Sequence, residues 1–320
     1  MMFKKILFTL CVALVGIAPA QAAWPERTVT LIVPWAPGGS TDILARMLSD
    51  YLTRSLGQTF IVENKAGASG NIGSNLVAKA KPDGYTLLVG SMSTHAMNQA
   101  LFSSMPFEPV DDFTPISLVA FVTNTLVINP KIPVNNVAEL IAYAKANPKK
   151  LNFASAGAGS TNHISAVLFE VAAGIQMTHI PYKGGAPAVL DTVAGQTEVL
   201  FGAGTQTLPH VKSGKLKLLA VTESARSPQL PDTPTVAETL PGYELVVWYG
   251  AFGPKDLPKE ITERLSTEIN RIVALPEVRS KMSAIGVEVV TSTPAGFAKT
   301  LQQDAAKFTK LIRELKITAE

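Results

Sequence analysis

The segment Thr28-Val-Thr-Leu-Ile-Val-Pro-Trp-Ala-Pro-Gly-Gly-Ser-Thr-Asp42 indicates the fold class, because its pattern predicts a strand, a glycine turn and the start of a helix. Residues 28–33 are β-branched or aliphatic, which is typical of a buried strand. Beyond the turn, apolar residues recur at the spacing of one buried helix face, at Leu44, Met47, Leu48 and Leu52. A strand that leads directly into a helix is the repeating unit of parallel α/β proteins.

Further short apolar runs follow, separated by helical patterns. They are Phe60–Glu63, Tyr85–Val89, Phe113–Ala120, Asn124–Asn129, Leu151–Ala154, Met177–Tyr182, Glu198–Phe201, Leu216–Val221 and Val246–Gly250. A chain of 320 residues is long enough for two domains. We expect α/β architecture, each domain a mostly parallel sheet flanked by helices. Domain 1 is predicted to be discontinuous, with residues 23–125 plus 236–320, and domain 2 to span 126–235. The Pro-rich segment 227–242 is predicted to lead back to domain 1.

The composition describes a globular chain with little net charge. It holds 28 Lys and Arg against 25 Asp and Glu, a formal net charge of +3, and 47% of its residues are hydrophobic. The apolar fraction is too high, and the net charge too small, for a disordered chain. The sequence contains no basic stripe or cluster, so binding to nucleic acid is not expected.

The first 22 residues have the three parts of a secretory signal peptide. Two lysines precede an apolar run, Ile6–Ile17, and Ala20-Gln21-Ala22 is a small-x-small cleavage site. The apolar run is shorter than the ~20 residues of a membrane-spanning helix, and an uncleaved anchor is the alternative. Cleavage after Ala22 predicts a periplasmic protein. It also removes the single cysteine, Cys11, and with it disulfide and thiolate chemistry.

Four times a strand is followed by a turn rich in Gly, Ser or Thr and then by a helix. These turns are Pro37-Gly-Gly-Ser-Thr-Asp42, Gly90-Ser-Met-Ser-Thr94, Ser155-Ala-Gly-Ala-Gly-Ser-Thr161 and Tyr182-Lys-Gly-Gly-Ala186. The first amides of a helix lack intrahelical acceptors and attract carboxylate, phosphate or sulfate. If the four turns face one another, they form an anion-binding cleft. A helix cap without a ligand is the alternative for each turn, and Asp42 fits that alternative best.

Side chains beside the turns extend this candidate site. Trp35 could wall the pocket, Lys183 could pair with a carboxylate, and His95 and His163 each begin a helix next to a turn. Local packing or capping is the alternative for both histidines. The candidate ligand-binding residues from this pattern are Trp35, Pro37, Gly38, Gly39, Ser40, Thr41, Ser91, Ser93, Thr94, His95, Ala156, Gly157, Ala158, Gly159, Ser160, Thr161 and Lys183.

Other chemistries find little support in the sequence. Gly157-Ala-Gly159 is the nearest approach to a dinucleotide turn, but Asn162 stands where the third glycine belongs. The four histidines are scattered, so we expect no metal and no cofactor. A periplasmic serine hydrolase that uses Ser160 and His163 is the enzymatic alternative. It lacks an orienting acid and a G-x-S-x-G elbow.

The stretch Val33–Arg46 resembles the opening signature of the solute-binding receptors of tripartite tricarboxylate transporters, the Bug-type extracytoplasmic solute receptors. Further motifs of that family occur in the same order along the mature chain. They are Val62-Glu-Asn64, Gly70-Asn-Ile-Gly73, Pro82-Asp-Gly-Tyr85, Asn152-Phe-Ala-Ser-Ala-Gly157, Pro181-Tyr-Lys-Gly184 and Pro231-Asp-Thr-Pro-Thr-Val236.

The resemblance implies a two-domain periplasmic binding protein, or Venus flytrap, that acts as a monomer and is not an enzyme. It would capture a small organic carboxylate and deliver it to a permease with a large and a small membrane subunit. A receptor that signals to a membrane sensor kinase is the alternative. The family's carboxylate-binding turns fall on Pro37–Thr41 and Ala156–Thr161, with Ser93 and Thr94 nearby.

One departure from the family pattern concerns the ligand. Many members carry an acidic residue after the strand that ends here at Phe201, whereas this chain continues Gly202-Ala203-Gly204-Thr205. Gly204 and Thr205 therefore join the candidate site without a carboxylate to bind an ammonium group. A di- or tricarboxylate is expected, or an aromatic carboxylate if Trp35 faces the cleft.

Overall fold

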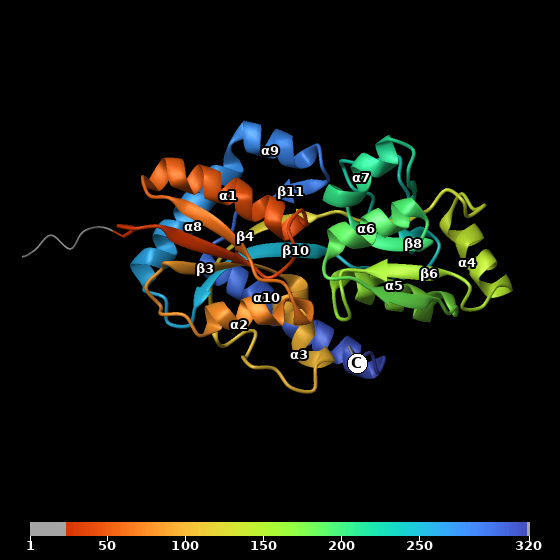
Figure 1. Cartoon of the computed structure of the whole chain (residues 1–320), viewed down its shortest axis with the longest axis horizontal. Helices are drawn as coiled ribbons and strands as arrows, with labels where there is room; N and C mark the ends of the chain where they lie inside the picture. Colours follow the sequence, from red (N-terminus) through yellow and green to blue (C-terminus); the bar gives the residue numbers. More distant parts are fainter. Residues whose placement is uncertain (1–23, 319–320) are drawn as a thin grey trace, which may run out of the picture.

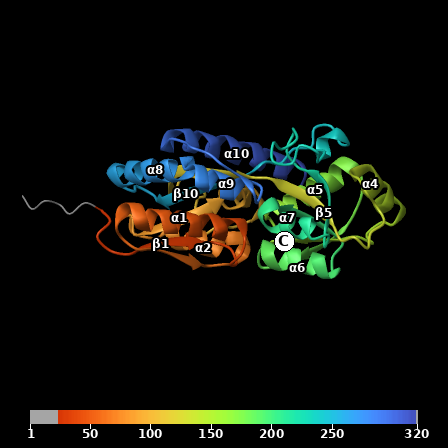
Figure 2. The ribbon, with the colours of Figure 1, turned by 90° about the horizontal axis from the view of Figure 1, so that it is seen from above.

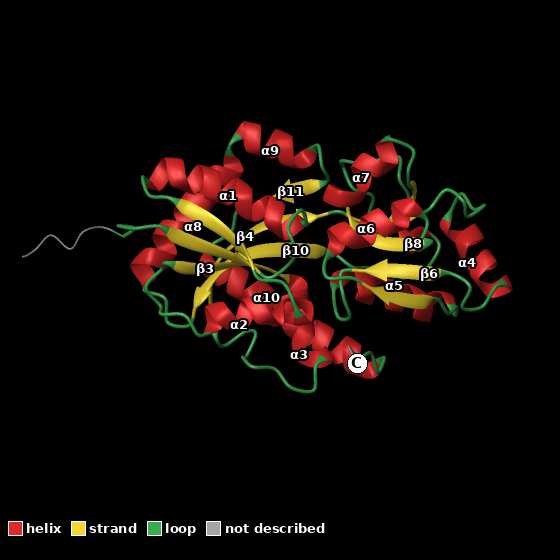
Figure 3. Ribbon diagram, in the orientation of Figure 1, coloured by secondary structure: helices red, strands yellow, loops and turns green. Residues whose placement is uncertain are grey.

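The computed structural model describes residues 24–318, and the predicted signal peptide, residues 1–22, lies outside this range. Two α/β units lie side by side along the long axis of the molecule (Figure 1). One unit is built from both ends of the described chain, coloured red to orange and blue, and the other from its middle, coloured green. The predicted fold class is confirmed: each unit has a central sheet with helices packed against it (Figure 3).

Six strands of the described chain form the sheet of the first unit, in the order β11-β4-β10-β3-β1-β2. Their bounds are β1 Val29–Val33, β2 Phe60–Asn64, β3 Thr86–Ser91, β4 Phe113–Val122, β10 Val247–Pro254 and β11 Val287–Val289. Strand β1 pairs parallel with β2 and with β3, whereas β10 runs antiparallel between β3 and β4. The sheet is therefore mixed, with its parallel part on the side of the opening strand.

The second unit has a five-stranded sheet in the order β7-β6-β8-β5-β9 within the described residues. Its strands are β5 Asn124–Ile128, β6 Asn152–Ser155, β7 Thr178–Pro181, β8 Val199–Ala203 and β9 Lys217–Val221. The β6 strand pairs parallel with β7 and β8, and β5 is antiparallel to both its neighbours. In both sheets a reversed strand, β10 or β5, thus lies beside the parallel part, and in the first sheet β11 is reversed as well, because it pairs antiparallel with β4.

Helices cover the faces of both sheets, and each α/β turn places a helix start at a strand end (Figure 2). In the first unit they are α1 Ser40–Leu56, α2 Asn71–Ala78, α3 Asn98–Leu101, α8 Lys259–Ala274, α9 Pro276–Ser283 and α10 Pro294–Glu314, with the short turns Ala68–Gly70 and Ser93–Met97. In the second unit they are α4 Val137–Ala146, α5 Thr161–Ala173, α6 Gly185–Ala194, α7 Gly204–Lys212 and the short turn Val236–Glu238. No helix in residues 24–318 is long and apolar enough to cross a membrane.

The crossings between the units differ from the predicted boundaries. The first lies at Thr123, between β4 of one sheet and β5 of the other, so Asn124 and Thr125 belong to the second unit. On the return, Val236 and Tyr243 are buried in the core of the second unit, so that crossing lies after residue 243 and not at 235. The proline-rich segment is therefore not a free linker, because its apolar side chains pack on the second core.

The centre of the first sheet is packed so closely that one position requires a glycine for space. A Cβ atom at Gly250 of β10 would lie 2.1 Å from Cζ of Phe297, the buried aromatic residue in the first turn of α10. Helix α10 can start there because Thr293 caps it and Pro294 occupies its first turn. The absent side chain at 250 allows this helix to lie against the sheet.

We predict that Gly250→Ala lowers the free energy of unfolding by about 1–3 kcal/mol, because the new methyl group overpacks the Phe297 ring. Urea denaturation of both proteins measures this difference. In a Phe297→Ala background the ring is absent, so the same substitution should change stability by less than about 0.5 kcal/mol. An equal loss in both backgrounds would contradict the packing explanation.

Candidate functional site

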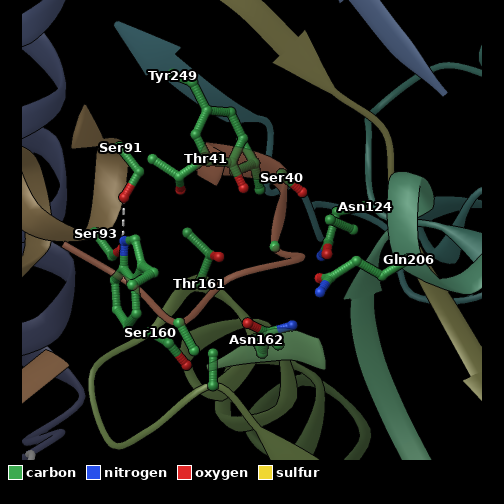
Figure 4. Close-up of a pocket in the computed structure, with 17 residues that line it drawn as sticks. Ser40, Thr41, Ser91, Ser93, Asn124, Ser160, Thr161, Asn162, Gln206 and Tyr249 are labelled. Carbon is green, nitrogen blue, oxygen red and sulfur yellow. Dashed lines mark hydrogen bonds between the residues drawn. The ribbon is translucent and has the colours of Figure 1, made fainter. Parts of the chain in front are cut away.

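A cavity between the two units collects residues from both sheets and from both crossings (Figure 4). The space measures about 500 Å³, part of it open to solvent. Its lining residues are Trp35, Ala36, Gly39, Ser40, Thr41, Ser91, Ser93, Asn124, Ala156, Ser160, Thr161, Asn162, Gly185, Ala203, Gln206, Val247 and Tyr249. All four predicted turns contribute to this lining, so the turns do face one another.

Four helices begin at the cavity, namely α1, α5, α6 and α7. The N-cap residues of α1, α6 and α7 are Gly39, Gly184 and Ala203, and none of them supplies a capping side chain. Ser160 caps α5 by accepting a hydrogen bond from the backbone of His163. The first-turn amides of the three uncapped helices have no acceptor within their own helix, and the positive ends of all four dipoles point at one space.

No residue that lines the cavity carries a formal charge. Asp42 lies in the first turn of α1, but its carboxylate is turned to the back of the turn. It accepts hydrogen bonds from the Gly38 amide (3.0 Å), Arg46 Nε (3.0 Å) and Asn64 Nδ2 (3.0 Å). Burial raises the pKa of Asp42, but these hydrogen bonds outweigh it and hold the pKa below its usual value. Asp42 thus fixes the Pro37–Gly39 turn and does not place a negative charge in the cavity.

Of the predicted site residues, one group lines the cavity and another does not. The lining group is Trp35, Gly39, Ser40, Thr41, Ser91, Ser93, Ala156, Ser160 and Thr161. The residues that the structure does not place in the lining are Pro37, Gly38, Thr94, His95, Gly157, Ala158, Gly159, Lys183, Gly204 and Thr205. Pro37, Gly38 and Lys183 are exposed, at the outer side of their turns. Gly204 and Thr205 are buried between the two units.

His95 points into the core of the first unit, contrary to the prediction that it contacts a ligand. Its ring stacks on Phe252 with centroids 4.0 Å apart, and Nδ1 lies 2.7 Å from Thr94 Oγ1. The ring occupies space beside Gly90, where a Cβ atom would lie 2.8 Å from it. Burial lowers the pKa of His95 to about 3, so the ring is neutral at pH 7.

Sequence reasoning missed several polar lining residues, above all Asn124, Asn162, Gln206 and Tyr249. Asn162 directly follows the predicted turn at Ser160-Thr161, and this adjacency could have identified it. Tyr249 lies on β10 opposite Ser91 of β3, a pairing between strands more than 150 residues apart that no local pattern reveals. Gln206 Nε2 is buried and has no hydrogen-bond partner in residues 24–318, so a donor is left at this end of the cavity.

The two units touch each other across the cavity. Ser40 Oγ of α1 and Thr205 Oγ1 of α7 lie 2.7 Å apart, and both residues are buried. The Ser69 hydroxyl donates to the carbonyl of Ala158 on the opposite unit. These two contacts join the units on either side of the cavity.

The residues of the hydrolase alternative do not form a catalytic pair. The Ser160 hydroxyl donates to the Gly157 carbonyl (2.7 Å), and Nδ1 of His163 accepts from the Gly159 amide (3.1 Å). The contact between Ser160 and His163 runs through the histidine backbone and not through its ring. Within residues 24–318, no three His, Cys, Asp or Glu side chains are grouped so that they could hold a metal ion.

A family model described as "Tripartite tricarboxylate transporter family receptor" matches residues 44–317. The chain belongs to this family. It is 36% identical over 307 residues to Protein BugT of Bordetella pertussis, covering 95% of this chain and 94% of BugT. Receptors of this family are periplasmic solute-binding proteins.

Solved structures show the same fold. R. palustris Rpa4515 with adipate has a TM-score of 0.90 at 35% identity, over 92% of this chain and 99% of that one. MatC from Rhodopseudomonas palustris with bound malate has a TM-score of 0.86 at 32% identity, over 90% of this chain and 100% of that one. Both relatives thus hold a carboxylate in a structure that superposes on nearly the whole of this receptor.

We predict that acid destabilises the receptor through His95. A histidine with a pKa of about 3 when folded and about 6.5 when unfolded stabilises the fold above pH 6.5, and this contribution is lost as the pH falls. Replacing His95 by Gln removes the titrating group. The free energy of unfolding of the parent, minus that of His95→Gln, should therefore decrease by about 1.4 kcal/mol for each pH unit below 6.5. Urea unfolding at pH 7.5, 6 and 5 measures this difference, and a difference that stays constant would refute the assignment.

Proposed function

We propose that this receptor binds a small organic carboxylate in the closed cleft and delivers it to a membrane permease with a large and a small subunit. The observation that carries the proposal is the convergence of four helix N-termini on a cavity whose lining has no formal charge. The bound adipate and malate of the two structural relatives support a carboxylate. The transporter named in the family description supports the permease.

In this proposal the ligand is held by backbone amides and hydroxyls from both units. Ser40, Thr41 and Thr161 present hydroxyls to the cavity (Figure 4). Ser91 and Ser93 lie at its far side, where their Oγ atoms are 3.0 Å apart. Gln206 lies at the opposite side, where its Nε2 has no hydrogen-bond partner within residues 24–318. Residues 24–123 with the C-terminal part and residues 124–243 act as two lobes that close on the ligand, and the two crossings form the hinge.

The proposed route begins with export. Residues 1–22 direct the chain to the periplasm and are cleaved after Ala22, and the mature receptor acts as a monomer. Ligand transfer requires the cleft to open, since the lining lies between two units in contact. A receptor with a neutral cleft releases its anion when the lobes separate, because the donors that surrounded it then belong to two distant surfaces.

We predict that adipate and malate raise the thermal stability of the protein, with a shift that grows with the logarithm of concentration. At a hundred times the Kd the stabilisation is about 2.7 kcal/mol. The matched control ligand is 1,6-hexanediol, which has the chain length of adipate and no carboxylate, and it should produce no shift. If no mono-, di- or tricarboxylate or aromatic acid shifts the melting temperature, the proposed ligand class is wrong.

A second prediction concerns Thr161, whose hydroxyl points into the cavity. Thr161→Val keeps the shape of the side chain and removes one hydrogen bond, which corresponds to an affinity loss of about fivefold. Isothermal titration with the best-binding carboxylate gives this ratio. Thr300→Val is the control, because Thr300 is half-buried on α10, is not part of the cavity lining, and donates its hydroxyl to the Gly296 carbonyl. Equal affinity of parent and Thr161→Val would remove Thr161 from the site.

A third prediction tests closure through the Ser40–Thr205 contact. Thr205 is not part of the lining, so Thr205→Val removes no contact with a ligand in the cavity. It removes the hydrogen bond to Ser40, which destabilises the closed state, and we expect ligand affinity to fall by about fivefold for this reason. Small-angle scattering should show a larger fraction of open protein at subsaturating ligand. In a Ser40→Ala background the contact is already absent, so Thr205→Val should then have little effect. A full additional loss there would show that the contact does not hold the lobes together.

A further inference from the structure

The loop between β6 and α5, residues 156–160, is shared by the cavity and the contact between the units. Ala156 and Ser160 line the cavity, and the Ala158 carbonyl accepts the hydrogen bond from Ser69 of the other unit. The loop contains Gly157 at φ +126° and Gly159 at φ +84°, a backbone region that glycine enters without steric cost. Local sterics therefore do not select one conformation of this loop.

Two histidine rings contact this segment of the chain, one at Gly159 and one at Ser155. His163 of α5 and His179 of β7 stack with centroids 4.2 Å apart and ring planes 16° apart. Phe153 of β6 stacks on His179 at 4.8 Å. Neither histidine belongs to the cavity lining found in residues 24–318. Three different elements thus fix the planes of the two rings.

Each ring supports one of the loop glycines. The Gly159 amide donates to His163 Nδ1 at 3.1 Å. Nε2 of His179 lies 2.6 Å from the Ser155 hydroxyl, and Ser155 Oγ in turn accepts from the Gly157 amide at 3.1 Å. The Gly159 amide thus has its acceptor in His163 and the Gly157 amide in Ser155, so both amides are already engaged within the second unit.

The first of these contacts requires a neutral ring, because Nδ1 can accept a hydrogen bond only when it carries no proton. Burial, and the neighbouring His179, lower the pKa of His163 to about 3. Burial lowers the pKa of His179 to about 4. Both rings are therefore neutral at pH 7, and Nδ1 of His163 can accept the hydrogen bond from Gly159 at this pH.

We propose that His163 and His179 are positioning residues, which fix the conformation of loop 156–160 and thereby prepare the cleft without touching the ligand. The inference rests on the proposed function in one respect, namely that this loop contacts the bound carboxylate. The role of both residues follows from the ring stack and from the contacts of the two glycine amides. The loop is held from behind by neutral side chains, and its cavity side stays open to a ligand.

Three variants separate the acceptor from the ring stack. His163→Phe keeps an aromatic ring in the stack and removes the acceptor for Gly159. His163→Asn loses the stack but places an amide oxygen near the position of Nδ1, so it restores the acceptor. Ser155→Ala removes the link between His179 and Gly157. Thr192→Val is the matched control, because it deletes a buried hydroxyl contact of the same unit, 2.8 Å to Thr197, outside the loop.

The deciding experiment is hydrogen–deuterium exchange of the ligand-free protein, followed by mass spectrometry of peptides that cover residues 155–161. We expect His163→Phe and Ser155→Ala to exchange at least tenfold faster than the parent in this segment. We expect His163→Asn to exchange within about twofold of the parent, and Thr192→Val to leave the segment unchanged. Equal exchange in the parent, His163→Phe and Ser155→Ala would overturn the proposal. Exchange in His163→Asn as fast as in His163→Phe would overturn it too.

A titration with adipate at pH 7.5 then links the loop to binding. His163→Phe should weaken binding by about tenfold and His163→Asn by less than about threefold, while Thr192→Val binds like the parent. Unchanged affinity in His163→Phe despite faster exchange would refute preparation of the cleft. If the parent itself does not respond to adipate, the exchange data still decide the positioning role, and the ligand proposal alone is at fault.

Discussion

Backbone amides in the first turn of a helix need acceptors that the helix itself does not contain. In this receptor the starts of α1, α5, α6 and α7 all open onto one cavity. Three of these starts have Gly39, Gly184 or Ala203 as N-cap, so no side chain takes the place of an external acceptor. Each unit directs the carboxyl ends of its parallel strands toward the other unit. The helices that follow these strands therefore begin at the space between the two units.

The neutral lining has a physical advantage for the proposed binding and release of an anion. A lysine or arginine in the cleft would lose its hydration whenever the lobes closed, a cost that binding must offset. Helix ends and hydroxyl groups are oriented by the fold before the ligand arrives. Selectivity in such a cleft depends on which donors and acceptors lie opposite each other, and the second unit contributes the side-chain amides of Gln206 and Asn124 to the lining.

The turns are held in place by groups that lie behind them. The carboxylate of Asp42 accepts the Gly38 amide, and the rings of His163 and His179 hold Gly159 and Gly157. In each case a titratable group faces the protein and not the cavity, and its protonation state at neutral pH is the one that can accept hydrogen bonds. Glycine leaves space beside these turns because it has no side chain, but it also leaves the backbone flexible. The hydrogen bonds to Asp42, His163 and Ser155 restrict that flexibility.

The α/β class, the strand–turn–helix units and the hydroxyl residues Ser40–Thr41 and Ser160–Thr161 could be predicted from the sequence, because these features depend on residues that are close along the chain. The sequence also carried the family motifs. Only the tertiary structure decided that the four turns meet in one cavity, that His95 turns into the core beside Gly90, and that Val236 and Tyr243 join the second core. It likewise brought Tyr249 opposite Ser91 and Thr205 against Ser40. These pairings join residues more than 130 positions apart, and sheet order and closure of the two units set them, not local spacing.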